Sequence, residues 1–511
     1  MASRWETDYI NLKGGLILDL PLIQQGLEQK GSANFLRNLE PSLSGGYSRV
    51  KGFTKFSDTE VPDASGPSTT IKGVDILRDG TVVVNRNAEI YTGTGATWTK
   101  RTSTSLSSES VKMRGARYRF TGVEKTMYVD GANDPYSINH SDKSFTQLSS
   151  PPTEVSGAEY VEEFAQRIWF AKGNFLSYTA PTTDNDFNTG NGAGVINVGS
   201  AIVGIKAFKG DLFIFCSDQI KRITGTSSAN FTLLDFVKSV GCVSGDTIQE
   251  VGSDVFYLSY DGIRTISDTD RSGSFQIQKS TRKINLAIQN NILNLSEFSS
   301  CKISLKNQYR IFGYSAAKQS FASQGLIATI FDNVVNSDSV EWSELYGIKS
   351  FSASNIITES GAEVVVFSND DNYVYLLESG NTFDGENITW VYWTPYYSFN
   401  DPVLRKTIYK ITLYGSFVGG LTANLDIRKN VNNPNFIFPA TDSLDISSGE
   451  TSTYGVSVYN SSLYSREGVN FAEKTVSGTG YNFSLRFSGT HNTNPFSIKG
   501  LAIEYSTQGR Q

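Results

Sequence analysis

A short apolar phrase recurs along this chain at nearly constant spacing, and it constrains the fold more than any other feature. Each copy is an apolar triplet, and most copies are followed by a polar turn with Gly, Asp or Asn and a second apolar stretch. That pattern is typical of a β-hairpin. The triplets end, in steps of 45, 41, 45, 43, 54 and 55 residues, at Val84, Val129, Phe170, Phe215, Leu258, Phe312 and Phe367. A hairpin that recurs every forty-odd residues indicates the blades of a β-propeller.

Further apolar runs precede several triplets, and they predict an inner strand for each unit. They lie at 74–77, 202–205 and 348–351, so each unit has three or four strands, the size of a blade. The first long step is explained by one amphipathic helix near 284–295, where Ile recurs every fourth residue. The second contains a polar loop that ends at Trp342. We therefore expect a β-propeller of six to eight blades over residues 61–390.

The two ends of the chain differ from the repeats. Residues 1–60 are interrupted by Gly and Pro, and residues 33–39 could form one or two helical turns. They are too apolar for a flexible tail, which favours an N-terminal arm that packs on a neighbour or closes a ring. Residues 391–511 contain strand patterns at 408–414, 423–427, 483–487 and 501–505. They predict a C-terminal β-sandwich with a long loop at 430–480, within an all-β fold class.

Composition limits the classes of function. The 511 residues carry a net charge of −6, which argues against a sequence-reading nucleic-acid binder with a basic face. Weak repulsion of phosphates would still suit a passage to which DNA must not adhere. The three cysteines form no CxxC and no disulfide framework, so buried thiols are expected. The N-terminus lacks the apolar core of a signal peptide and no stretch approaches eighteen apolar residues, so we expect no membrane-spanning segment.

Few residues suggest chemistry of their own. Two histidines lie in loop-like surroundings, and no G-x-S-x-G, HExxH or P-loop is present, so we expect neither an enzyme nor a cofactor. Asp184, Asp186 and Asn188 place three oxygen ligands at alternate positions, as a calcium loop would. The sixth position is Thr189 rather than Gly and the twelfth is Val195 rather than Glu, so this metal site is a weak candidate.

Two other classes of function stay open on the residues alone. A glycan- or receptor-binding propeller could stack sugars on Trp98, Trp169 or Trp390, although core packing is the commoner fate of a Trp in a strand. A scaffold propeller of a cell would predict a monomer with binding loops on one rim.

A series of short motifs resembles the tail nozzle proteins of short-tailed bacteriophages, also called packaged-DNA-stabilising proteins. The N-terminal part of the resemblance comprises Asn38, Gly46, Tyr47, Arg49, Gly52, Thr54 and Lys55. A central blade at 203–225, the segments 241–245 and 254–266, the helix, the Trp342-Ser343-x-Leu345 element and the strands at 481–505 follow in the family's order. The match covers most of the chain through the order of these motifs, and residues 430–480 lie outside it.

The resemblance implies a structural virion protein without enzymatic activity. It would form a homohexamer below the tail adaptor protein and present surfaces for tail fibre or plug proteins. Viral double-stranded DNA would pass through the lumen without sequence-specific binding. The implied location is the tail of the virion, after assembly in the host cytoplasm, and the motif residues would lie at interfaces.

Overall fold

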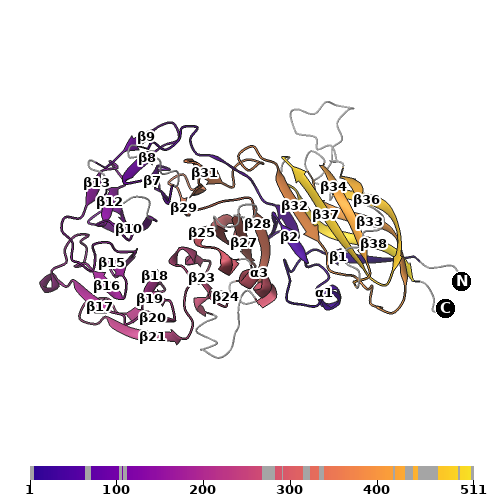
Figure 1. The fold of residues 1–511 in the computed structure, drawn as a ribbon, viewed down its shortest axis with the longest axis horizontal. Coiled ribbons are helices and arrows are strands. Elements are labelled where there is room, and N and C mark those ends of the chain that lie inside the picture. The colour runs from indigo at the N-terminus through magenta and orange to yellow at the C-terminus, as the bar shows by residue number, and fades with distance from the viewer. Residues whose placement is uncertain are drawn as a thin grey trace.

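The repeated triplets form the second strand of each of seven blades, and the blades close into a β-propeller with a β-sandwich beside it (Figure 1). The computed structural model describes residues 5–63, 71–102, 106, 112–267, 282–290, 292–314, 323–332, 339–417, 421–431, 441–446, 470–492 and 495–507. The triplets within the second strands are buried because adjacent blades cover both faces of each strand. The predicted all-β propeller of six to eight blades with a C-terminal sandwich is confirmed.

Each blade is an antiparallel sheet that begins with an inner strand at the propeller axis. The strands of the first four blades are β6 (Gly73–Ile76), β7 (Val82–Arg86), β8 (Glu89–Gly93) and β9 (Trp98–Lys100); β10 (Arg114–Phe120), β11 (Val123–Val129), β12 (Tyr136–Asn139) and β13 (Phe145–Gln147); β14 (Tyr160–Phe164), β15 (Arg167–Lys172), β16 (Phe175–Tyr178) and β17 (Gly194–Asn197); and β18 (Ile202–Phe208), β19 (Asp211–Cys216), β20 (Gln219–Thr224) and β21 (Thr232–Lys238).

The remaining three blades include one with three strands among the described residues and one completed from the N-terminus. Their strands are β22 (Gln249–Val251), β23 (Asp254–Ser259) and β24 (Gly262–Thr265); β25 (Glu297–Ile303), β26 (Gln308–Tyr314), β27 (Ser323–Ile330) and β28 (Val340–Tyr346); and β29 (Ser352–Ile357), β30 (Glu363–Ser368), β31 (Val374–Leu377) and β5 (Phe53–Lys55). Since β5 comes from the N-terminal segment, the two ends of the repeat region are joined within the seventh blade.

The N-terminal segment pairs with strands of its own chain rather than standing apart as an arm. Its other elements are β1 (Glu6–Asn11), α1 (Leu22–Glu28), β2 (Phe35–Arg37), β3 (Leu39–Pro41) and β4 (Tyr47–Arg49). Strands β1, β3 and β4 join the sandwich, and β2 lies between the propeller and the sandwich. The helical turns predicted at 33–39 are wrong, because this stretch runs extended and its buried residues contact two domains.

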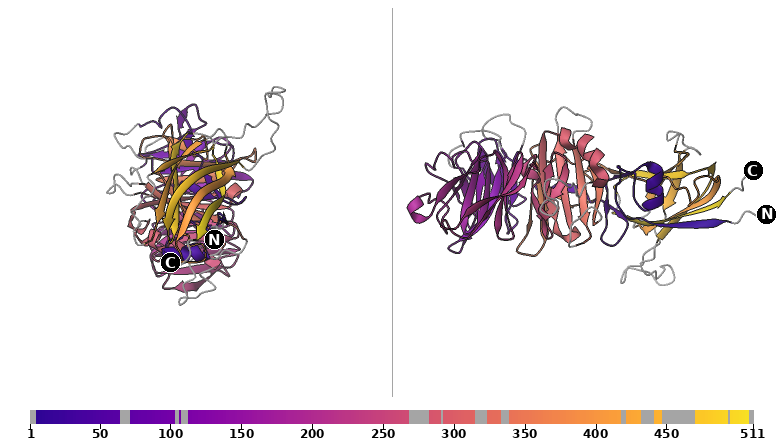
Figure 2. Two further views of the ribbon diagram at one scale, coloured as in Figure 1. Left: turned by 90° about the vertical axis from the view of Figure 1, so that its right-hand side faces the viewer. Right: turned by 90° about the horizontal axis from the view of Figure 1, so that it is seen from below.

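The C-terminal domain packs two sheets against each other. Its strands are β32 (Ile388–Trp393), β33 (Lys406–Ser416), β34 (Leu421–Lys429), β35 (Asp442–Ile446), β36 (Asn470–Gly480), β37 (Phe483–His491) and β38 (Ser497–Thr507). One sheet has the order β3-β4-β38-β33-β36, with β1 also on β38, and the other contains β32, β37, β34 and β35. Figure 2 shows the first of these sheets at the end of the molecule distant from the propeller.

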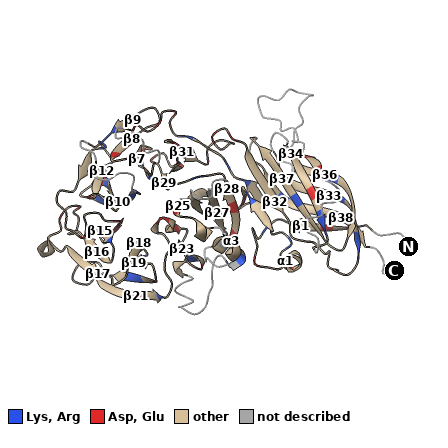
Figure 3. Ribbon diagram, in the orientation of Figure 1, with Lys and Arg blue, Asp and Glu red and all other residues tan. Residues whose placement is uncertain are grey.

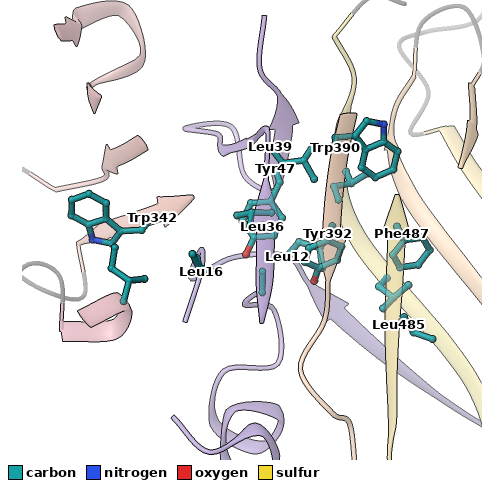
Figure 4. Close-up of a cluster of buried hydrophobic side chains, with 14 of the residues drawn as sticks. Leu12, Leu16, Leu36, Leu39, Tyr47, Trp342, Trp390, Tyr392, Leu485 and Phe487 are labelled. Carbon is teal, nitrogen blue, oxygen red and sulfur yellow. The ribbon is translucent and has the colours of Figure 1, made fainter. Parts of the chain in front are cut away.

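A single nine-stranded sheet connects the two domains. Blade 6 continues from β28 through β2 into β32, β37, β34 and β35. Figure 4 shows Leu36 of β2 between Trp342 of blade 6 and Tyr392 of the sandwich, and all three are at most 1% exposed. The hydrophobic core therefore runs through β2 without interruption, which makes the propeller and the sandwich one mechanical unit.

Three local predictions differ from the structure. The helix expected near 284–295 is a short α3 (Asn285–Asn290) flanked by 3₁₀ turns at Arg282–Ile284 and Ile292–Asn294. The inner strand expected at 348–351 begins instead at Ser352. Strands β35 and β36 lie within the predicted loop 430–480, while its residues 432–440 and 447–469 are outside the described residues. None of the helices that the structure describes is long and apolar enough to cross a membrane.

Candidate functional site

The inner strands of the propeller enclose a cavity of about 550 Å³ on its axis. The lining carries acids and bases from several blades, and the two signs are interspersed around the ring (Figure 3). A cavity of this size is in the range that small-molecule sites occupy. Its chemistry depends on whether these charges point freely into the space or bind one another.

An ion cluster bridges one part of this cavity from blade 2 to blade 5. The Arg114 guanidinium contacts both carboxylate oxygens of Asp246, at 2.7 and 2.9 Å, and Lys112 Nζ lies 3.1 Å from the same carboxylate. Burial alone would raise the pKa of Asp246, but the two cations hold it well below its ordinary value. Blades 2 and 5 lie on opposite sides of a seven-bladed ring, so this cluster spans the axis.

Two further charge pairs of the cavity also bind across blade boundaries. Asp75 of blade 1 accepts from Arg117 of blade 2 at 3.0 Å and from Ser354 of blade 7 at 2.6 Å. Lys206 of blade 4 donates to Glu162 of blade 3 at 2.8 Å. Burial opposes ionisation of Asp75, yet Arg117 and the hydrogen bonds lower its pKa. These side chains tie neighbouring blades together, which accounts for their charge without a ligand.

The axial cavity is therefore not a passage for DNA. The major groove of B-DNA alone is about 12 Å wide, whereas one arginine side chain reaches across this bore to Asp246. Among the described residues, no group of three or more His, Cys, Asp or Glu could hold a metal ion.

The N-terminal motif residues named above, from Asn38 to Lys55, begin at the junction of propeller and sandwich. Asn38 is buried in a left-handed conformation (φ 53°), and its side chain donates to the carbonyls of Tyr346 in blade 6 and Thr389 in β32, at 3.0 and 2.8 Å. Its amide oxygen accepts from Tyr346 N at 2.8 Å. Tyr47 Oη donates to Gly31 O at 2.8 Å and accepts from Gly15 N at 3.1 Å. One asparagine thus holds both domains at a fixed distance.

The rest of the motif follows the chain toward the seventh blade. Arg49 is 1% exposed and donates to Asn381 O at 3.1 Å. A Cβ on Gly46 would lie 2.1 Å from Ile498 O, and one on Gly52 would lie 1.9 Å from Thr382 O, so both backbones need glycine.

Thr54 and Lys55 complete the motif on β5. Thr54 Oγ1 donates to Ser379 Oγ at 2.8 Å, and Lys55 Nζ lies 3.8 Å from the Tyr373 ring centre. The predicted motif residues are thus brought together within one chain, and they hold its parts to one another.

A buried four-charge network next to the motif escaped the sequence reasoning. Arg310 of β26 is fully buried and lies 2.7 Å from both Glu40 of β3 and Glu378, which follows β31. Lys306 contacts the same two carboxylates. Burial raises the pKa of Glu378, but Arg310 and Lys306 outweigh it and lower that pKa to about 2. The sequence signal was a charge inside an apolar strand, between Tyr309 and Ile311.

The calcium candidates do not form a common site. Asp184 accepts from Tyr118 Oη at 2.6 Å and from Lys125 Nζ at 2.9 Å. Asp186 accepts from Asn191 Nδ2 at 2.7 Å, and Asn188 Oδ1 accepts from Gly190 N at 2.9 Å. The oxygens are used by protein donors, as turn residues commonly are.

The tryptophans considered for sugar stacking do not offer free ring faces. Trp169 and Trp390 are fully buried, and Trp98 is half-buried with its Nε1 donating to Thr59 O at 3.0 Å. The exposed aromatic rings lie elsewhere, chiefly on the sandwich.

Among known proteins, this chain is similar only at the level of three-dimensional structure. No known family matches the sequence, and no curated protein sequence matches it. The chain is similar to the Neurospora crassa Pan2 WD40 domain (7% identity, 65% of this chain and 97% of that one, TM-score 0.38) and to YCF48 bound to D1 peptide (8%, 64% and 97%, 0.40). A third structure is an extracellular domain of a proposed one-component system from B. thetaiotaomicron (10%, TM-score 0.38), where the match covers 66% of this chain and 41% of that one. At these scores the propeller assignment rests on the sheet order and ring closure of the chain itself.

Proposed function

We propose that this chain is a structural virion protein, a tail nozzle of short-tailed bacteriophages that assembles as a homohexameric ring below the tail adaptor. The observation that carries the proposal is the position of the family motif. The residues from Asn38 to Lys55 join blade 6, blade 7 and the sandwich, so the N-terminal part of the resemblance lies where the two domains of the subunit are held together. A subunit that forms the wall of a channel needs a rigid shape and does not need a catalytic centre.

The charge of the chain also suits a passage for DNA. A net charge of −6 provides no excess of cations to trap phosphates. The bases of the axial cavity are bound to acids of the same chain. Because an arginine crosses that axis, the lumen in this proposal lies between subunits, where a contact repeated six times closes a ring. The expected partners are the adaptor, fibre or plug proteins and the passing double-stranded DNA.

The test is the mass and shape of the purified full-length protein. Light scattering should give about six times the 56.1 kDa chain, and electron microscopy should show a six-fold ring with a central hole. A monomer that forms this ring only on an added adaptor would also support the proposal. A stable dimer, or a monomer that no adaptor assembles, would contradict it.

A further inference from the structure

The outer face of the distal sandwich sheet carries the largest group of exposed aromatic rings among the described residues. This aromatic face consists of Trp5, Tyr9, Tyr409, Tyr414 and Phe471 on and beside strands β1, β33 and β36. The side chain of Trp5 is 61% exposed, that of Tyr9 72% and that of Phe471 55%. Figure 2 shows this sheet turned away from the propeller, so neither domain covers the face. Exposed rings gathered on one face indicate a binding surface.

The strand register shows how the rings are arranged. Tyr9 lies opposite Ala502, and Tyr414 lies opposite both Gly500 and Phe471. The small residues of β38 therefore separate Tyr9 on β1 from Tyr414 on β33, two strand positions away, and Phe471 on β36 lies one strand further. One strand spacing is about 5 Å. Trp5 stacks on Tyr409 at 4.7 Å with only 8° between the ring planes. Rings thus flank a flat, narrow strip.

The polar groups between the rings indicate which kind of ligand this face could bind. Lys410 is held by Glu473 at 2.8 Å and by Glu504 at 3.7 Å, so the one base in this part of the face is outnumbered by acids. A weakly acidic face disfavours phosphates and anionic lipids. Thr7 and Thr475 expose hydroxyls in the same row, opposite Glu504 and Lys410 respectively. Apart from Ala502, the outward positions of β1, β33, β36 and β38 carry no aliphatic side chain, so small and polar groups lie between the aromatic rings.

We propose that the aromatic face binds a neutral oligosaccharide. Sugar rings present apolar C–H faces that lie on aromatic rings and hydroxyls at their rims that bond to Thr, Glu and Lys. A flat strip flanked by rings and lined with small residues accommodates a linear chain of pyranoses. The proposal does not depend on the nozzle proposal, because it concerns a surface that the axial cavity and the junction leave unused.

The test uses maltohexaose, cellohexaose and xylohexaose as neutral probes, titrated calorimetrically into the full-length protein. At least one probe should bind, and Tyr9→Ser and Trp5→Ala should each weaken that binding about tenfold, the loss expected for one stacked ring. The matched control is Tyr260→Ser, which removes an exposed tyrosine (61%, against 72% for Tyr9) from the propeller and should leave the affinity unchanged. Circular dichroism would show that the variants fold.

Each other outcome would overturn the inference. If none of the three hexasaccharides binds, the face is not a site for neutral glycans. If one binds and all three variants retain the affinity, the site lies elsewhere. If Tyr9→Ser or Trp5→Ala lowers the mass seen by light scattering while no sugar binds, the face is a contact between copies. That mass measurement also separates this test from the nozzle proposal, which requires a ring whether or not a sugar binds.

Discussion

The buried charge network offers the sharpest test of how the junction is held. Replacing Glu378 with Gln keeps the shape of the side chain but removes one of the two carboxylates around Arg310. Arg310 is fully buried and still contacts Glu40, so the variant leaves a half-neutralised cation in the interior. Removing one partner of a buried ion pair costs about 3–5 kcal/mol, and the remaining carboxylate favours the lower end.

The pKa of Glu378 gives an independent magnitude. Burial raises this pKa, yet Arg310 and Lys306 lower it to about 2 from an ordinary value of 4.5. That difference corresponds to roughly 3 kcal/mol of stability at neutral pH. Because the folded-state pKa is depressed, the contribution is complete above about pH 4.5 and is lost as the pH falls through about 2. By the same relation it is about 1.4 kcal/mol at pH 3.

The assay is urea unfolding of the wild type and of Glu378→Gln at pH 7 and at pH 3, monitored by circular dichroism. The variant should be less stable by roughly 3 kcal/mol at pH 7 and by about half that or less at pH 3. The control is Asp235→Asn, which breaks the pairs of a half-exposed carboxylate with Lys238 and Lys221 and should cost less than about 1 kcal/mol. If the variant loses the same free energy of unfolding at both pH values, or loses none at pH 7, the stabilisation does not come from the Glu378 carboxylate.

Three further predictions concern the junction and the cores. Gly52→Ala should destabilise the protein by about 2 kcal/mol or more, because the new Cβ would lie 1.9 Å from a backbone oxygen, whereas Gly478→Ala, whose nearest neighbour is 3.8 Å away, should unfold at nearly the wild-type urea concentration. Asn38→Ala loses three side-chain hydrogen bonds and should cost about 3 kcal/mol; a loss below about 1 kcal/mol in the same assay would mean that the two domains do not depend on it. Burial raises the pKa of the thiols to about 11 or 12, so a thiol reagent at pH 8 should label none in the native protein and all of them in urea, and native labelling would contradict the burial of Cys216, Cys242 and Cys301.

The sequence predicts the propeller well because each blade repeats one physical requirement. A second strand lies between neighbours within its blade and is covered by adjacent blades, so its central residues are buried and an apolar triplet recurs, with Arg310 as its one charged member. The inner strands are harder to recognise, because one side of each faces the polar axial cavity. The apolar run at 348–351 predicted an inner strand because Ile348 and Phe351 are apolar. Both are buried, but the strand itself starts only at Ser352.

The junction could not be predicted from periodicity. Ala33, Leu36 and Leu39 are buried at every third position, which is a helical spacing, but they belong to an extended segment that passes between two domains. Strand β2 has three residues and one parallel bridge to blade 6, from Arg37 to Glu344. Its conformation is set by partners about 300 residues away, and no local pattern encodes such pairing. The ion pairs across the propeller axis were missed for the same reason.

The structure limits which surfaces could form the contacts between copies of this chain in the proposed ring. The N-terminal segment supplies β5 to blade 7, β2 to the nine-stranded sheet and β1 to the distal sheet, so its strands are already paired within one subunit. The propeller axis is crossed by Arg114 and Asp246. A DNA passage built from such subunits must therefore be lined by the outer surfaces of the propeller or the sandwich, and the contacts between copies must come from those surfaces too. Since the nine-stranded sheet fixes the angle between the two domains, the subunit would enter the proposed ring with its shape already set, and the diameter of that ring would follow from the contact surface rather than from a hinge.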